Sequence, residues 1–171
     1  SNGIDLLKII SQKDNDYVAN LYPDIYQGVT KIHDLILEFE NLNTSDSLFL
    51  FLQGWLFPTD ASINVNLSQS DSLKSIFPYL QIPNGKDNWK TIINNIGFPK
   101  GKNKTMIIDL TNKLIHDDYR LRIRTNMQIY WDHVFIANSH SNNKINTMEL
   151  KPIYADLHYR GFSTTSQKNL S

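Results

Sequence analysis

Hydrophobic and polar residues alternate within a long stretch of the chain, Tyr119 to Ala137. Between residues 121 and 131 every odd position except Thr125 is apolar, and the even positions are polar or amphipathic. Because neighbouring side chains of a β-strand point to opposite faces, this pattern predicts one half-buried strand whose odd positions face the core. The stretch exceeds the usual strand length of about 5–6 residues. We therefore expect a bend or β-bulge near Thr125–Asn126, and we consider a tight hairpin there less compatible with the pattern.

Shorter apolar segments predict further strands. Residues 47–56 form a nearly continuous apolar run, which is typical of a strand covered on both faces, and Gly54 within it indicates a bulge or a close backbone approach. Residues 62–68 alternate strictly and predict a strand with Ile63, Val65 and Leu67 inward. Other strands are predicted at residues 77–82, 89–96 and 104–110, with one or two more at 146–159. Residues 29–39 are also predicted as a strand, although the spacing of their apolar residues fits a helix as well.

The overall pattern predicts an all-β domain with a short N-terminal helix. Apolar residues at helical spacing over residues 4–10 indicate that helix, and residues 1–28 are interpreted as the helix and a lead-in. About eight short strands separated by turn residues are typical of a β-sandwich. We favour a jelly roll over an up-and-down barrel because the connections are long and irregular. The 171 residues show no composition break, so we expect a single domain, with a frayed tail at residues 164–171.

Charge and composition narrow the classes of function. The 17 basic residues balance the 17 acidic ones, so no overall field attracts nucleic acid or an anionic membrane surface. No apolar run reaches the roughly 18 residues of a membrane span. The absence of cysteine excludes disulfides, thiolate metal sites and cysteine catalysis. The histidines lack metal-ligand spacing, and no nucleophile or phosphate-binding motif occurs. We therefore expect no metal, no cofactor and no enzymatic activity.

The polar face of the 119–137 stretch is the predicted binding surface. Arg122, Arg124, Gln128 and Tyr130 all lie at its even positions. Arginine offers a rigid fork of donors, glutamine both a donor and an acceptor, and tyrosine a flat apolar body with a hydroxyl tip. Such side chains are typical of surfaces that bind proteins or sugars. Trp89 follows a polar loop and is the candidate for an exposed stacking aromatic, although a core position is favoured for it.

Purely structural roles are the alternative for these residues. Arg120, Arg122 and Arg124 fit a solvent-facing ladder that pairs with acids on a neighbouring strand, and this alternative is favoured over a binding role. Asp132 and His133 are adjacent in sequence, so on a strand they point to opposite faces and do not simply act as an acid–base pair. For Asp132 we expect a carboxylate that accepts backbone hydrogen bonds at a bend of the strand.

Three segments taken together resemble a known family. They are FLFLQGWLFPTDASINVNLSQ, KTMIIDLTNKL, and RLRIRTNMQIYWDHVFIA followed by LHYRGFS. They are similar to the C-terminal domain of bacterial proteins with tetratricopeptide or FG-GAP repeats, in the ASPIC/UnbV-like group, over residues 29–163. The most specific pieces are Thr125–Asn126, then Ile129–Asp132, and Arg160–Ser163.

This resemblance implies a non-catalytic accessory or protein-interaction module of a larger bacterial protein. It implies export to the periplasm or the cell exterior, with other domains of the parent protein or a separate protein as partners. The family carries no assigned catalytic residues. A second resemblance, through Ile129, Asp132 and Val134, is to galactose-binding jelly rolls. It implies the alternative of a carbohydrate-binding module with a glycan as partner.

Overall fold

The computed structural model describes residues 3–44, 46–86, 88–114, 118–139, 148–159 and 161. The chain divides into two compact units, residues 1–141 and 142–171. In the second unit, the described residues 148–159 form neither helix nor strand, so the strands expected there are wrong for these residues. Pro152 supplies no backbone N–H for a strand ladder, and Ile153 and Leu157 are fully exposed. Residues 146–147 and the expected tail at 164–171 lie outside the described residues.

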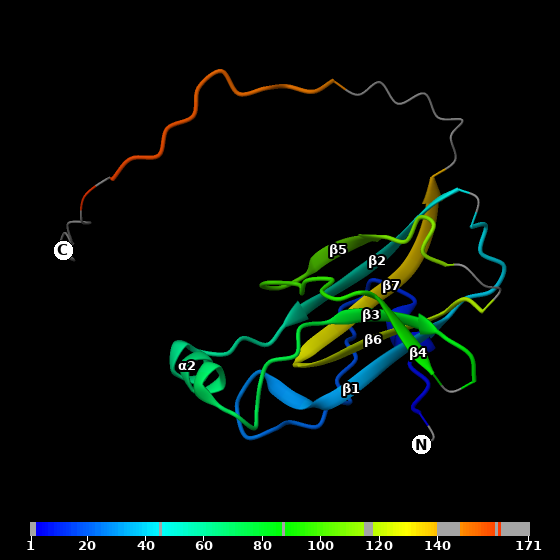
Figure 1. The fold of residues 1–171 in the computed structure, drawn as a ribbon, viewed down its shortest axis with the longest axis horizontal. Helices are drawn as coiled ribbons and strands as arrows, with labels where there is room; N and C mark the ends of the chain where they lie inside the picture. The colour runs from blue at the N-terminus through cyan, green and yellow to red at the C-terminus, as the bar shows by residue number, and fades with distance from the viewer. Residues whose placement is uncertain are drawn as a thin grey trace, which may run out of the picture. The chain divides into compact units, whose positions relative to one another are not determined.

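The first unit consists of two antiparallel sheets (Figure 1). Its elements are α1 (Leu7–Ile10), β1 (Val29–Glu38), β2 (Ser47–Leu56), α2 (Ala61–Gln69), β3 (Tyr79–Pro83), β4 (Trp89–Ile93), β5 (Lys104–Asp109), β6 (Arg120–Met127) and β7 (Ile129–Ser139). The larger sheet has the order β1-β6-β3-β4 and the smaller one β5-β2-β7. The predicted β-sandwich with a short N-terminal helix is confirmed, and its jelly-roll topology stays a prediction.

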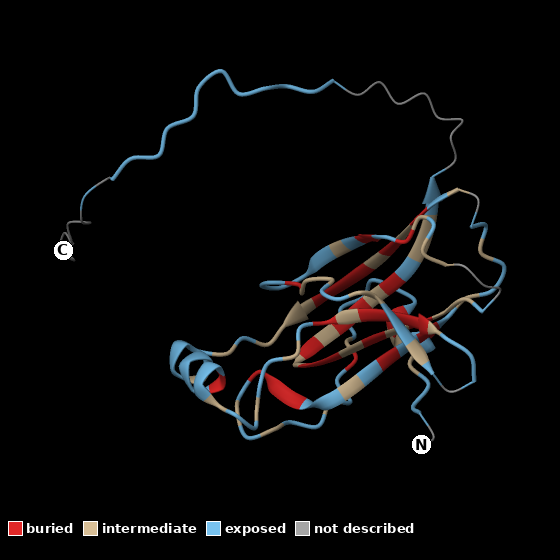
Figure 2. Cartoon of the chain, in the orientation of Figure 1, coloured by how far each residue is buried: buried red, intermediate tan, exposed pale blue. Residues whose placement is uncertain are grey.

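One apolar core joins the two sheets, and in Figure 2 its buried residues run along the central strands. The strands of both sheets contribute Leu35, Leu37, Leu48, Leu50, Leu52, Leu80, Ile82, Ile108, Leu121, Ile123, Ile129, Trp131 and Val134. The inward assignment of the odd positions between residues 121 and 131 is thereby confirmed. Leu121 and Ile129 have no exposed surface.

The 119–137 stretch forms two strands, so the prediction of one bent strand is corrected. β6 belongs to the larger sheet and β7 to the smaller sheet, and Gln128 is the corner between them. The backbone N–H of Gln128 donates to the Gly28 carbonyl at 3.0 Å, and its carbonyl accepts from Phe57 N–H at 2.9 Å. Both backbone groups of Gln128 thus bond to other segments at the corner, where the chain passes from one sheet to the other. The expectation against a tight hairpin is confirmed.

Residues 61–69 form the helix α2, so the strand predicted at 62–68 is wrong. The Asp60 carboxylate accepts the backbone N–H of Ile63 at 2.8 Å and caps the helix, and this hydrogen bond is the main cause of a lowered pKa at Asp60. Of the three side chains expected inward only Leu67 is buried, and Val65 is 52% exposed. A helix satisfies its own backbone hydrogen bonds, so this segment needs no partner strand.

Gly54 lies at an irregularity in the pairing of β2 with β7, as predicted. The register shifts between Gln53 and Gly54, where Asp132 is the extra residue on β7. A Cβ atom at Gly54 would lie 2.4 Å from the Tyr130 carbonyl oxygen, so both the bulge and the close backbone approach are confirmed. Coverage of β2 on both faces is only partly found, because Leu48, Leu50 and Leu52 are buried and the phenylalanines between them are half-buried.

Candidate functional site

The corner at Gln128 separates the predicted binding surface into two groups. Arg122 and Arg124 lie on β6 in the larger sheet, and Tyr130 lies on β7 in the smaller sheet. The prediction that the even positions share one face is therefore wrong. Positions 122, 124 and 130 point away from the core, but the two sheets have opposite outer faces. Trp89 on β4 joins the arginines, and Gln128 joins Tyr130.

In the first group, Trp89 and Arg122 pack against each other. The Arg122 guanidinium carbon lies 4.5 Å from the centre of the Trp89 ring, and that of Arg120 lies 5.8 Å from it. Arg122 Nε also donates to Gln81 Oε1 at 2.8 Å. Trp89 is half-buried, and arginine side chains cover part of its ring. The structure therefore does not present Trp89 as an open stacking platform.

Asp34 on β1 supplies the acid of the arginine ladder. It lies opposite Arg124 in the register of β1 and β6, and its Oδ1 is 2.9 Å from Arg124 Nε, an ion pair in which the N–H is not aligned for a hydrogen bond. Its Oδ2 is 3.8 Å from Arg122 Nη1. The structural alternative, a ladder with a cross-strand acid, is thus confirmed for these two arginines.

The second group is an aromatic cluster on the smaller sheet, formed by Tyr17, Trp55, Phe57 and Tyr130, which we call the Trp55 cluster. The Tyr130 and Trp55 rings stack with their centres 4.7 Å apart at an interplanar angle of 20°. Tyr17 meets Trp55 edge-on at 6.3 Å, and Phe57 is tilted against it at 5.9 Å. Gln128 Nε2 donates to the Tyr130 hydroxyl. Two of the predicted site residues therefore support the position of Trp55.

Asp132 holds the N-terminal segment that carries Tyr17 of this cluster. This carboxylate is fully buried, and its Oδ1 accepts the backbone N–H groups of Asp14 and Asn15 at 3.3 and 3.1 Å. Its Oδ2 accepts from Gln53 Nε2 at 3.3 Å. The expected structural role of Asp132 is confirmed. Burial raises the pKa of the neighbouring Tyr17, and the Asp132 charge adds to this shift.

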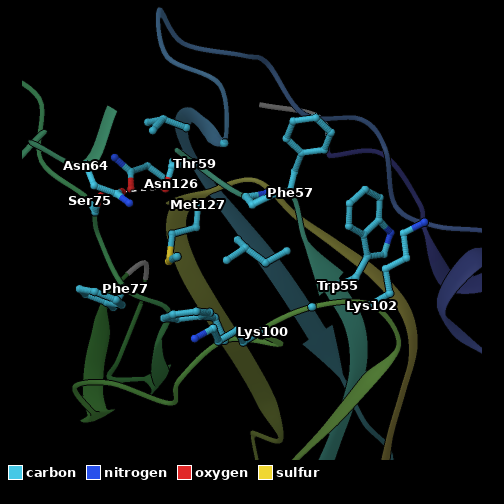
Figure 3. Close-up of a pocket in the computed structure, with 16 residues that line it drawn as sticks. Trp55, Phe57, Thr59, Asn64, Ser75, Phe77, Lys100, Lys102, Asn126 and Met127 are labelled. Atoms are coloured by element: carbon cyan, nitrogen blue, oxygen red, sulfur yellow. Dashed lines mark hydrogen bonds between the residues drawn. The ribbon is translucent and has the colours of Figure 1, made fainter. Parts of the chain in front are cut away.

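Trp55 also borders a cavity of about 530 Å³ at the end of the sandwich where the chain turns at Gln128 (Figure 3). We call it the end cavity. Its lining residues are Gly28, Val29, Trp55, Leu56, Phe57, Pro58, Thr59, Asn64, Ser75, Phe77, Phe98, Lys100, Gly101, Lys102, Asn126 and Met127. They come from the end of β2, the start of β1, the end of β6 and the loops around α2 and before β5, so both sheets contribute to the wall.

The neutral polar side chains of the wall mostly bond to the protein itself. The buried Asn126 accepts from Ile76 N–H at 2.7 Å through Oδ1 and donates to the Lys74 carbonyl at 2.8 Å through Nδ2. Thr59 donates to Asn64 Oδ1 at 2.7 Å. These bonds hold the loops that form the wall. The surface left for a ligand is therefore mainly apolar and aromatic.

The end cavity could not be predicted from the sequence. Its residues come from several separate segments, and only the apolar continuation of β2 through Trp55-Leu56-Phe57 gave a local signal. Gly28, at φ +80°, brings the start of β1 against this continuation, because a Cβ there would lie 2.9 Å from the Phe57 carbonyl oxygen. Such a contact between distant segments leaves no periodic pattern.

Within the described residues, no three histidine or acidic side chains gather in a way that could hold a metal ion. No helix in that part of the chain is long and apolar enough to cross a membrane. Comparisons of the chain with models of protein families, with curated proteins and with solved structures find no match in any of the three.

Proposed function

We propose that this chain is a non-catalytic binding module of a larger bacterial protein and that its ligand-binding site is the end cavity. The observation that carries the proposal is the cavity itself. Its volume of about 530 Å³ falls within the roughly 300–1,000 Å³ of typical small-ligand sites, and its wall is mainly apolar and aromatic with few available polar groups.

The end cavity is a better candidate than the arginine surface predicted from the sequence. Arg122 and Arg124 already pair with Asp34, and Arg122 also bonds to Gln81 and covers Trp89. A ligand there would have to replace contacts that the protein makes with itself. The same argument weakens the carbohydrate alternative at that surface, since an arginine partly covers the ring on which a sugar would stack.

Attachment to another domain is a second candidate function, favoured by the outer face of the smaller sheet. Phe51 on β2 pairs with Ile107 on β5 and with Phe135 on β7, so three apolar side chains form a row across the sheet. Ile107 is 62% exposed and Phe135 37%. An exposed apolar row suits contact with a neighbouring domain of the parent protein. Cross-linking from position 135 in the parent protein tests this role. Absence of a cross-linked product between this domain and another would contradict it.

A neutral fluorescent probe tests the end cavity. N-phenyl-1-naphthylamine should bind with one site per chain, and Ser75→Trp should weaken binding at least tenfold by placing a large side chain at the cavity wall. Asn66→Trp is the matched control, since Asn66 is exposed on α2 and does not line the cavity. Equal binding by the two folded variants, or no binding by the unmodified chain, would contradict the proposal.

A further inference from the structure

Two lysines give the end cavity a positive charge. Lys100 and Lys102 line it, and no aspartate or glutamate is among the lining residues. Both lysines are exposed and lie in the loop before β5. Neither forms an ion pair with an acid in the part of the chain that the structure describes. Their charges are thus available to a ligand.

The position of the lysines relates them to the aromatic wall. Lys102 Nζ lies 5.7 Å from the centre of the Trp55 ring. In Figure 3 Lys102 lies beside Trp55, and Lys100 lies between Phe77 and Trp55 in this view. A lysine has a flexible stem and three N–H donors, so each ammonium group can turn toward an anion at the border of the cavity.

We propose that the end cavity binds an amphipathic monocarboxylate, with its apolar body between Leu56, Phe77 and Met127 and its carboxylate at Lys100 and Lys102. This inference rests on the proposed function and names the ligand class for the same site. The charge of the lining is complementary to a carboxylate, and its wall is complementary to an alkyl or aromatic body. A sugar fits less well, because Asn126, Thr59 and Asn64 already bond within the protein.

The same arrangement disfavours two related kinds of ligand. A cationic amphiphile of equal chain length would be repelled by the ammonium groups of Lys100 and Lys102, and among the described residues no carboxylate lines the cavity to attract it. A neutral alcohol would bury the same apolar surface but would gain no ion pair. The contribution of the head group can therefore be separated from that of the apolar body by comparing ligands with one chain length.

Titration calorimetry with decanoate, decanol and decyltrimethylammonium, each below its micelle-forming concentration, tests the inference on the unmodified chain. We expect decanoate to bind about tenfold more tightly than decanol, which corresponds to about 1.4 kcal/mol, and the cation to bind most weakly. Raising the salt concentration should reduce the advantage of decanoate, because the ammonium groups are exposed.

The double variant Lys100→Gln, Lys102→Gln supplies the second measurement. It should weaken decanoate binding about tenfold and leave decanol binding unchanged. Lys90→Gln is the matched control, since Lys90 is an exposed lysine on β4 outside the cavity. Equal binding of decanoate and decanol, or unchanged decanoate binding by the double variant, overturns the carboxylate assignment and leaves the cavity as an apolar site. Absence of binding by all three ligands overturns both the assignment and the proposed function.

Discussion

Gly54 and Tyr130 are in such close backbone contact that a side chain at position 54 has no room. A Cβ there would lie 2.4 Å from the Tyr130 carbonyl oxygen and 3.1 Å from the Trp131 Cα. We expect Gly54→Ala to cost about 1–3 kcal/mol of unfolding free energy or more, because backbone atoms have to move apart. Urea denaturation measures this cost. Gly3→Ala is the control, since a Cβ at Gly3 meets nothing within 4 Å; equal stability of the two variants would contradict the close approach.

The core positions Ile123 and Ile129 give a second prediction. They lie in different sheets and are 1% and 0% exposed. Ile123→Ala and Ile129→Ala should each cost roughly 2–5 kcal/mol in unfolding free energy, as large-to-small changes in a packed core do. Ile36→Ala on β1, where the side chain is 54% exposed, should change stability far less. Similar losses at all three positions in thermal and chemical denaturation would contradict the assignment of the faces.

The arginines of β6 are expected to differ in their effect on stability. Arg122→Ala should cost about 1–2 kcal/mol, because it removes the donor to Oε1 of the buried Gln81. Arg124→Ala should cost at most about 1 kcal/mol, since its pair with Asp34 is partly exposed to solvent. Chemical denaturation of the two variants measures the difference. A larger loss at Arg124 than at Arg122 would show that the pairing with Asp34 dominates the ladder.

Asp132 should control how firmly the N-terminal segment is held. Asp132→Ala removes the acceptor of the Asp14 and Asn15 backbone N–H groups and of Gln53 Nε2, and we expect a loss of roughly 2–4 kcal/mol. The decisive measurement is hydrogen exchange, which should become faster at Asp14 and Asn15 than in the unmodified chain. Asp16→Ala is the control, because Asp16 is exposed in the same segment. Unchanged exchange at Asn15 in Asp132→Ala would contradict the role of this carboxylate.

His33 should make stability depend on pH. Burial lowers the pKa of this imidazole below its ordinary value, an effect opposed by the Lys31 carbonyl and the Asp34 charge. Below about pH 6.5 the unfolded chain therefore binds a proton more readily at this site than the folded chain does. Stability from this group should be complete above about pH 6.5 and should fall as the pH drops below it. His33→Gln should flatten that part of the profile in denaturation measured between pH 5 and 8, and an unchanged profile would assign the dependence to other groups.

The sequence predicted most of the strands because alternation records which face of a strand meets the core. It failed to reveal the corner at Gln128 because the alternation keeps its phase there. Leu121 and Ile123 point inward before the corner, and Ile129 and Trp131 point inward after it. A continuous pattern thus conceals a change of sheet. The candidate site was misplaced for the same reason, since its residues follow one pattern along the chain but lie on opposite outer faces.

The helix α2 shows a different limit. Strict alternation over residues 62–68 is compatible with a strand, but among the described residues no strand pairs with this segment, and the cap at Asp60 favours a helix. The end cavity depends on contacts between loops, such as that of Gly28 with Phe57, which no local pattern records. The contacts that these loops make with distant segments, more than the loop sequences themselves, determine the wall of the end cavity.

The corner at Gln128 has a consequence for the way the protein opens. Its hydrogen bonds to Gly28 and Phe57 fasten together three chain segments that border the end cavity. Since β6 continues covalently into β7 at this point, the two sheets cannot separate here without breaking those bonds. Partial opening of the sandwich should therefore begin at the opposite end, and the walls of the end cavity should keep their spacing while strand ends elsewhere fray.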